Sequence, residues 1–392
     1  MSASVRSQPC AGALGAFRVI ELGMYGSAPI CSMLLADFGA DVIKVEPPEG
    51  DFYRQLPPFE RGESHYFMSV NRNKRSVVLD LKTDFGREAL GTLIATADVL
   101  VENFRPGVLT RLGFSYEQCA KINPGLVYCS ISGFGQTGPQ REEPGLDLIV
   151  QGYAGMMLSS GEENQAPFKI APAVPDVMGG QSAAYAILAA LLARERSGLG
   201  QFVDISLLDT SIFSMQLVYL AQWLGSGESP ARNGSGHPSM VPMQSFRAGD
   251  GRWFNLVGNT DRMWSDACKA MGCEDLSVDP RFATNAGRTA NRQQLLDILE
   301  PLFATRPAQD WIELFKGAGI PCGPVNDLAQ AMASPQLKAR QMLVDMPHPR
   351  LGHVKTIGIA PKLTATPGTL RRPAPGLGEH TEEVLREVSR GD

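Results

Sequence analysis

The chain has 392 residues, of which 43% are hydrophobic and 20% charged, a globular composition that excludes a disordered or fibrous protein. Its length exceeds that over which one hydrophobic core usually grows, so we expect two domains. The formal net charge of -5 offers no field that attracts a polyanion, which argues against a nucleic-acid partner.

The N-terminal half alternates short apolar runs with helical segments. Residues 17–22 form an apolar run, a turn rich in Gly and Ser follows, and residues 29–38 have a helical pattern before a second run at 41–46. This order is typical of a strand-helix-strand unit. Alternation that continues in this way favours a parallel sheet flanked by helices. Further strands are predicted at 76–80, 99–102 and 126–132, with a helix at 84–96.

The clearest helix is predicted over residues 176–197, where apolar residues recur at helical spacing and Gly198 follows. After a strand at 201–205, residues 225–242 are crowded with Gly, Ser, Pro and Asn and predict a linker. The remaining segments predict a smaller domain followed by an extended, proline-rich strap. These segments are a strand at 253–257, helices at 288–303 and 308–317, and the strap at 361–378.

Cysteine and histidine spacing argues against a disulfide framework and against a metal site. The seven cysteines include no C-x-x-C pair, and the five histidines show no ligand spacing. Residues 1–17 lack the apolar core of a secretory signal, and the longest apolar stretch, 183–193, is shorter than the ~20 residues that cross a bilayer. We therefore expect a cytoplasmic protein with neither a metal nor a membrane partner.

One glycine motif suggests a dinucleotide site. Residues Gly133–Gly138 match G-x-G-x-x-G and follow a predicted strand. A dinucleotide fingerprint must open a helix, whereas Pro139, three charged residues and Pro144 follow here and predict a loop. A nicotinamide or flavin site is therefore not favoured, and the glycines suit a close approach of the backbone to a ligand or another chain.

Asp176 is the strongest candidate for catalysis, because the usual motifs of phosphoryl transfer, zinc hydrolysis and serine hydrolysis are absent from the sequence. It stands just ahead of the clearest helix and before Gly179 and Gly180. An Asp in this position is either an ordinary N-cap or a nucleophile whose ionised form the helix N-terminus favours. The local pattern does not distinguish these two interpretations.

Several longer motifs, in the same order along nearly the whole chain, resemble the class III or CaiB/BaiF-type coenzyme A transferases, whose members include formyl-CoA transferase. The resemblance implies a large CoA-binding domain with a Rossmann-like parallel sheet over residues 1–215, completed by 330–392. It also implies a smaller α/β domain with linkers over 216–329 and an interlocked ring dimer. The motifs are Leu35–Glu46, Asn73–Ser76, Val101–Gly107, Gly133–Gly135 and Gly319–Val325.

By this resemblance, Asp176 is the nucleophile that carries the acyl group through mixed-anhydride and aspartyl-CoA thioester intermediates. Coenzyme A thioester is then a substrate, and no cofactor is bound permanently. Asp147, which matches a glutamate near the active site of formyl-CoA transferase, has either a supporting role there or a plain helix-capping role. The family's coenzyme contacts fall on Tyr25, Gly26, Leu79, Asp80, Leu81, Lys82, Asn103, Phe104, Arg105 and Arg111.

Two departures from the family limit how far its details apply. Formyl-CoA transferase has a glutamine at the position of Gly26 and a glycine-rich flap where this chain has only Asn233–Gly236. Oxalate and formate are therefore not implied, and succinyl-CoA with a dicarboxylic acid is the preferred pair. The related α-methylacyl-CoA racemases have a histidine where this chain has Leu146, so one of the two bases needed for racemisation is missing.

Three hypotheses remain at the level of the sequence. The leading one is CoA transfer between two carboxylic acids. The others are an acyl-CoA racemase or epimerase on the same fold, and a non-catalytic subunit of a CoA-transferase. Family members form dimers of interlocked chains, so we expect a homodimer, with a heteromer of related subunits as the alternative.

Overall fold

The computed structural model describes residues 12–389, which divide into two compact units. The first unit is assembled from three segments, Met1–Ala154, Ile170–Met215 and Pro335–Asp392. The second consists of Gly155–Lys169 and Gln216–Ser334. This division places Gly155–Lys169 in the second unit, whereas the sequence-based division kept it within residues 1–215.

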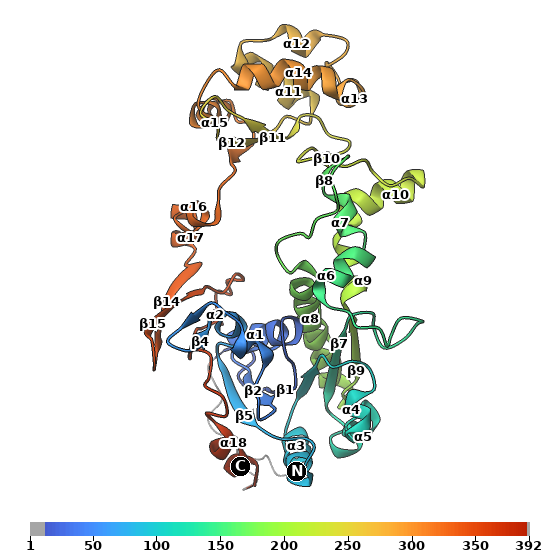
Figure 1. Cartoon of the computed structure of the whole chain (residues 1–392), viewed down its shortest axis with the longest axis vertical. Helices are drawn as coiled ribbons and strands as arrows, with labels where there is room; N and C mark the ends of the chain where they lie inside the picture. Colours follow the sequence, from blue (N-terminus) through green and yellow to red (C-terminus); the bar gives the residue numbers. More distant parts are fainter. Residues whose placement is uncertain (1–11, 390–392) are drawn as a thin grey trace. The chain divides into compact units, whose positions relative to one another are not determined.

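A parallel six-stranded sheet forms the centre of the first unit (Figure 1). The first three of its strands in the chain occupy one half of the sheet and the last three occupy the other, in the order β5-β2-β1-β6-β7-β9. In such a doubly wound sheet, ligands bind outside the carboxyl ends of the strands where the order reverses, here between β1 and β6. The strands are β1 (Arg18–Glu21), β2 (Asp41–Glu46), β5 (Lys74–Val78), β6 (Val99–Glu102), β7 (Val127–Ser132) and β9 (Phe202–Ser206).

Helices cover both faces of this sheet, and each face has its own apolar core. Strands β1, β6 and β7 are buried along their whole length, because helices enclose the side chains on both faces of the sheet. One core joins the sheet to α1 (Ser27–Asp37) and α8 (Val174–Ser197), and the other joins it to α3 (Asp84–Ala95), α5 (Tyr116–Ile122) and α18 (Thr381–Ser389). Also in this unit are η1 (Phe52–Gln55), β3 (Phe59–Glu60), β4 (Glu63–Ser64), α2 (His65–Val70), α4 (Val108–Arg111), α6 (Asp147–Tyr153) and α9 (Leu207–Ser214).

Glycines bring α8 against its neighbours. A Cβ atom on Gly180 would lie 2.7 Å from the backbone oxygen of Ser27, at the start of α1. A Cβ atom on Gly179 would lie 2.3 Å from Leu207 Cδ2, in α9. Only glycine permits these approaches without displacing a neighbour. The N-terminal turns of α1 and α8 therefore lie side by side.

The C-terminal segment belongs to the first unit and packs along β5, the strand at one edge of its sheet. The Asn73 side chain accepts hydrogen bonds from the backbone N–H groups of Arg371 and Arg372, so the proline-rich strap is tied to the start of β5. Arg75, also on β5, pairs with Glu383 and Glu387 of α18 at 3.0 and 2.7 Å. This segment also contains α17 (Pro335–Ala339), β14 (Leu343–His348) and β15 (Gly352–Ile357).

The second unit has an antiparallel sheet of its own and a separate aromatic core. Its three strands have the order β11-β12-β13 and pack on helices α11, α14 and α15. The predicted helix over 288–303 is in fact two helices, because the helical conformation is interrupted at Asn291, which caps both of them. The elements are α7 (Met156–Ser159), β8 (Gly161–Glu162), η2 (Gln216–Leu220), α10 (Ala221–Ser226), β10 (Asn233–Gly234), β11 (Met243–Arg247), β12 (Trp253–Val257), α11 (Asp261–Met271), α12 (Asp275–Val278), α13 (Asn285–Ala290), α14 (Arg292–Phe303), α15 (Ala308–Gly317), β13 (Cys322–Pro324) and α16 (Leu328–Met332).

One helix among the described residues, α8, is long and apolar enough to cross a membrane by length and composition alone. Core helices of soluble proteins pass the same test, so this is weak support for a membrane span. The apolar side chains that α8 does bury, including Ala183, Ile187 and Leu191, belong to the core between α1 and the sheet.

Candidate active site

Two turns meet where the strand order reverses. The turn after β1, Gly23–Gly26, leads into α1, and the turn after β6 begins with Asn103. The Asn103 amide accepts a hydrogen bond from Met24 N at 3.0 Å and donates one to Met24 O at 2.8 Å. These two bonds fasten the predicted coenzyme contacts Tyr25–Gly26 to the predicted contacts that begin at Asn103.

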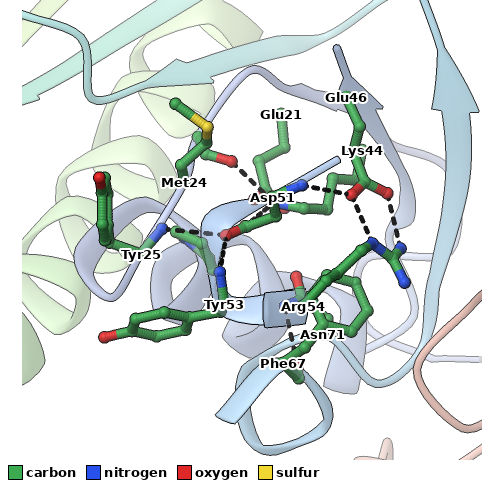
Figure 2. Close-up of polar contacts among 12 residues, drawn as sticks. Glu21, Met24, Tyr25, Lys44, Glu46, Asp51, Tyr53, Arg54, Phe67 and Asn71 are labelled. Atoms are coloured by element: carbon green, nitrogen blue, oxygen red, sulfur yellow. Dashed lines mark hydrogen bonds and ion pairs between the residues drawn. The ribbon is translucent and has the colours of Figure 1, made fainter. Parts of the chain in front are cut away.

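A cluster of buried charges lies beneath the first turn (Figure 2). Glu21, the last residue of β1, pairs with Lys44 and Lys74, each at 2.8 Å. Burial alone would raise the pKa of Glu21, but the two ammonium groups outweigh burial and lower it to about 2. Lys44 also donates to Gly23 O at 2.7 Å and pairs with Asp51 at 2.8 Å. The cluster therefore connects three strands to the turn that opens α1.

Asp51 connects the charge cluster to the backbone of two tyrosines through hydrogen bonds. It is fully buried, and its Oδ1 accepts the backbone N–H of Tyr53 at 2.9 Å and that of Tyr25 at 3.5 Å (Figure 2). Tyr25 has a left-handed backbone with φ of 66°. Such a conformation is unfavourable for a bulky residue and is usually found where surrounding structure enforces it. The Tyr25 and Tyr53 rings lie edge to face at 5.9 Å, and the Tyr66 ring lies 5.5 Å from Tyr53.

Asp176 lies over the turn, in the first turn of α8. The prediction that this helix starts at residue 176, with Asp176 as its possible N-cap, is wrong: α8 begins at Val174, and its N-cap is Ala173. Asp176 is instead the third helical residue, after Pro175, which is common at helix starts. A Cβ atom on Gly26 would lie 2.6 Å from Asp176 Oδ2 and 3.0 Å from its Cβ. Gly26 therefore leaves the space that the carboxylate occupies.

The surroundings of Asp176 favour a negative charge. The carboxylate lies at the N-terminus of α8 and against Gly26, the N-cap of α1, and both helix dipoles direct their positive ends there. Tyr53 is close enough to sense this charge. Burial raises the pKa of Tyr53 to about 12, and the carboxylates of Asp176, Asp51 and Asp147 add to that rise. Tyr53 is therefore a neutral hydrogen-bond donor beside Asp176.

Asp147 is the first residue of α6, and its Oδ1 accepts a hydrogen bond from Gln151 Nε2 at 2.8 Å. The buried Gln151 also accepts from Ile170 N at 2.9 Å. This places Asp147 in a local hydrogen-bond network and within electrostatic reach of Tyr53. Leu146, which precedes it, is the N-cap of α6 and is 63% exposed.

The other predicted coenzyme contacts differ in exposure. Leu79 is buried at the end of β5, and Leu81 packs against the core beneath α3. Asp80 accepts a hydrogen bond from Lys82 N, and the Lys82 side chain is exposed. Phe104 packs partly into the same core as Leu81, so one face at most is available for stacking. Arg105 and Arg111 are exposed, as phosphate contacts require.

The glycine motif at 133–138 has a structural role. No helix follows it until α6, so the expected loop is confirmed and the motif does not form a dinucleotide-binding fingerprint. A Cβ atom on Gly133 would lie 2.4 Å from the Cα of Gly145. The two backbone segments can pass at this distance only because both residues are glycine. Within residues 12–389, no group of three or more His, Cys, Asp or Glu side chains is placed to hold a metal ion.

Sequence reasoning missed Lys44, Asp51 and Tyr53. Lys44 interrupts the apolar run of β2, whereas Lys74 begins β5 beside Arg75; a charge buried within a central strand requires a partner. That interruption was the available signal. Asp51 and Tyr53 lie at a short 3₁₀ turn, which has no periodic pattern to find.

Comparisons with known proteins agree with this fold and show the family of the chain. The sequence profile of CoA-transferase family III matches residues 14–381. Acetyl-CoA:oxalate CoA-transferase of Acetobacter aceti is 39% identical over 374 residues, covering 95% of this chain and 94% of its own. Succinyl-CoA:mesaconate CoA-transferase of Haloarcula hispanica is 39% identical over 391 residues, covering 97% of each chain.

A crystal structure of a CaiB/BaiF family protein from Brucella suis superposes with a TM-score of 0.86 at 36% identity, covering 96% of this chain and 100% of that one. The chain therefore belongs to CoA-transferase family III. It is an enzyme of the CoA-transferase class, as the sequence resemblance implied, and its fold is the one expected.

Replacing Gly26 by Ala tests the contact with Asp176. The added methyl group occupies the position of the carboxylate and forces Asp176 to rotate, while the fold keeps its cores. We expect kcat to fall by about 100-fold, because a misplacement of about 1 Å at a reacting group has that effect. The melting temperature should change little. Steady-state kinetics and calorimetry check both, and unchanged kcat contradicts the placement of Asp176.

As a matched control, Gly91→Ala introduces the same methyl group inside α3, where a Cβ atom would meet nothing within 4 Å. We expect wild-type kinetics and equal or slightly higher stability, because alanine is the better helix former.

Proposed function

We propose that this enzyme transfers coenzyme A from a donor acyl-CoA to an acceptor carboxylic acid with Asp176 as the covalent carrier. The observation that carries the proposal is the position of the Asp176 carboxylate, against Gly26 and between the N-terminal turns of α1 and α8. The two helix N-termini stabilise the negative charge, and Gly26 leaves the space that the carboxylate occupies. A carboxylate held in this way serves as a nucleophile.

Four steps then move the acyl groups. The Asp176 carboxylate attacks the thioester carbon of the donor, the C–S bond breaks, and CoA thiolate leaves a mixed anhydride. The thiolate attacks the Asp176 acyl carbon and releases the donor acid, which leaves an aspartyl-CoA thioester. The acceptor carboxylate displaces CoA thiolate from that thioester to form a second anhydride. The thiolate attacks the acceptor's acyl carbon, and Asp176 is regenerated as a carboxylate.

The oxygen balance of these steps has a definite consequence. The departing donor acid carries away one oxygen atom of Asp176, and the acceptor acid replaces it with one of its own. Tyr53, whose pKa is raised by burial and by the Asp176 charge, is our candidate donor to oxyanions that form at Asp176. The coenzyme is held at the turns after β1, β5 and β6, where Lys82, Arg105 and Arg111 face its phosphates.

We assign the acceptor to the dicarboxylic acids and the donor to succinyl-CoA. Two relatives are named for dicarboxylates, oxalate and mesaconate, and one of them for succinyl-CoA. Tyr25 and Tyr66, the ring neighbours of Tyr53, are each more than a third exposed. Their hydroxyl groups are donors suited to the second carboxylate of such an acid.

Trapping during turnover tests the carrier. With hydroxylamine present, the peptide Ile170–Arg194 should gain a hydroxamate at Asp176. After a single turnover with an acceptor acid labelled in both carboxylate oxygens with ¹⁸O, the same peptide should gain one heavy oxygen. Mass spectrometry of tryptic digests reads both. In Asp176→Ala, transfer should fall by at least about 10⁴-fold, and full activity there would overturn the proposal.

A panel of acids tests the substrate class. With succinyl-CoA as donor, we expect kcat/KM for dicarboxylic acceptors to exceed that for monocarboxylic acids of equal length by about 10-fold or more, because unpaired polar groups in the site reject the latter. Product acyl-CoA esters are quantified by mass spectrometry. Equal values for the two series would remove the dicarboxylate assignment and leave the carrier role of Asp176 untouched.

We also infer that the enzyme is a homodimer. Apolar side chains on α6, α8 and α9 are exposed in the single chain, and patches of this kind mark protein interfaces. Those exposed by about half or more are Leu146, Leu148, Tyr153, Tyr185, Leu192 and Phe213.

Light scattering at micromolar concentration should therefore give twice the 42.3 kDa of one chain. Leu192→Glu places a charge within the exposed apolar surface and should shift the mass toward the monomer, whereas Lys121→Glu, an exposed charge change on α5, should leave it unchanged. A monomeric wild-type chain contradicts this inference.

A further inference from the structure

Glu102 is a buried carboxylate that the proposed chemistry does not use. It is the last residue of β6, directly before the predicted coenzyme contacts Asn103–Arg105, and is 6% exposed. Its Oε2 accepts the backbone N–H of Phe104 at 2.8 Å. The Glu102 side chain therefore fixes the backbone at the centre of that turn.

A chain of hydrogen bonds links Glu102 to the glycine loop at 133–138. Glu102 lies opposite Ser130 of the neighbouring strand β7, near enough for the Ser130 hydroxyl to lower the pKa of the Glu102 carboxyl, and Ser130 Oγ accepts from Gln136 Nε2 at 2.8 Å. The backbone N–H of Gln136 donates in turn to the Asp204 carboxylate at 3.1 Å, on β9. Besides its close approach to Gly145, the loop holds Gln136 where its side chain can direct the Ser130 hydroxyl.

The direction of these bonds selects the ionised form of Glu102. Because Gln136 donates to Ser130 Oγ, the Ser130 proton is available for Glu102, and Phe104 N–H donates to the other side of the same carboxylate. Protonation makes one oxygen of Glu102 a donor and weakens the carboxyl group as an acceptor, so donors that face it favour the ionised form. The turn is therefore held by two charge-assisted bonds only when Glu102 is ionised.

Burial opposes that ionisation. It raises the pKa of Glu102 to about 7, although the hydrogen bonds from Ser130 and Phe104 pull it down. A cavity of about 250 Å³ borders Glu102, Ser130, Gln136 and Arg105, and gives protons a route to the carboxylate. The other titratable groups that line this cavity or sense the charge are Arg105, Tyr116, Glu117, Tyr128 and Cys129.

None of those neighbours competes with Glu102 near neutrality. Burial raises the pKa of Tyr128 and of Cys129 above their ordinary values, so both stay neutral. The pKa of Glu117 is lowered by its hydrogen bond from Ser115, so it stays ionised. Glu102 is therefore the group around this cavity that changes charge between pH 6 and pH 8.

We propose that Glu102 is a positioning residue for the coenzyme: its carboxylate holds the Asn103–Arg105 turn in the conformation that binds acyl-CoA, and protonation of that carboxylate weakens binding. This inference rests on the proposed coenzyme site at that turn. Coenzyme affinity is then tied to pH through a group that touches neither the substrate nor Asp176.

Binding and kinetics as a function of pH test the proposal. From pH 8 to pH 6, KM for acyl-CoA should rise about five- to tenfold, because the ionised fraction of Glu102 falls about tenfold over this interval, while kcat at saturation stays nearly constant. Glu102→Gln imitates the protonated acid, so its KM should be high at both pH values. A phosphate of the coenzyme itself titrates at about pH 6. Because that titration affects wild type and Glu102→Gln alike, the difference between the two proteins reports Glu102 alone.

Two further variants sharpen the test. Ser130→Ala removes a bond that favours ionisation, so the midpoint of the KM change should move to higher pH. Glu117→Gln alters an exposed carboxylate of the same cavity that does not contact the turn, and should behave as wild type. Hydrogen–deuterium exchange of the peptide containing Asn103–Arg105, corrected for intrinsic rates, should increase at pH 6 in wild type and at both pH values in Glu102→Gln.

Calorimetric titration of CoA into Asp176→Ala separates this inference from the proposed function, because binding there does not depend on catalysis. The role of Glu102 is supported if CoA binding to Asp176→Ala weakens toward pH 6 and this weakening is lost in the double variant Asp176→Ala/Glu102→Gln. Binding with the same pH dependence in both proteins overturns it. Absence of CoA binding at every pH overturns the coenzyme site itself, and this inference with it.

Discussion

The buried charge cluster of Glu21, Lys44, Lys74 and Asp51 is the constraint on which the site depends. Each of these side chains is fully excluded from solvent. Loss of one partner would leave an uncompensated charge in the interior, which typically costs about 3–5 kcal/mol. The same ions fix the backbone of the Gly23–Gly26 turn and of Tyr53. The same contacts thus stabilise the sheet and fix the backbone next to Asp176.

The sheet separates two tasks between its faces. Asp176 comes from α8, which covers one face, whereas Glu102 and Ser130 point to the side of α5, where Tyr128 belongs to the second core. The two sides meet at the carboxyl ends of β1 and β6, through the hydrogen bonds between Asn103 and Met24. In the proposed mechanism, one helix thus supplies the covalent carrier, and strands β6 and β7 supply the carboxylate that supports the Asn103–Arg105 turn.

Much of the sheet was predictable, because buried parallel strands read as apolar runs; the predicted strands 41–46 and 99–102 match β2 and β6. Helix α8 was found but its start was wrong, because Asp is a favoured N-cap whereas Ala173 gives no such signal. Contacts between distant residues, such as Gly26 with Asp176, follow from the packing of α1 on α8 and have no local pattern. The roles assigned to the coenzyme contacts came from family resemblance and remain predictions.

The return of the chain to its first unit has a consequence for biosynthesis. Arg75 lies between Asp41 on β2 and Glu387 on α18, more than 300 positions later in the chain. The edge of the sheet at β5 therefore stays open on the ribosome until nearly all residues have been made. Exposed strand edges and apolar surface invite association with other chains during that interval. In a nascent chain of this enzyme, β5 is therefore the element that needs protection by chaperones for longest, because it is synthesised early and its contacts with α18 form last.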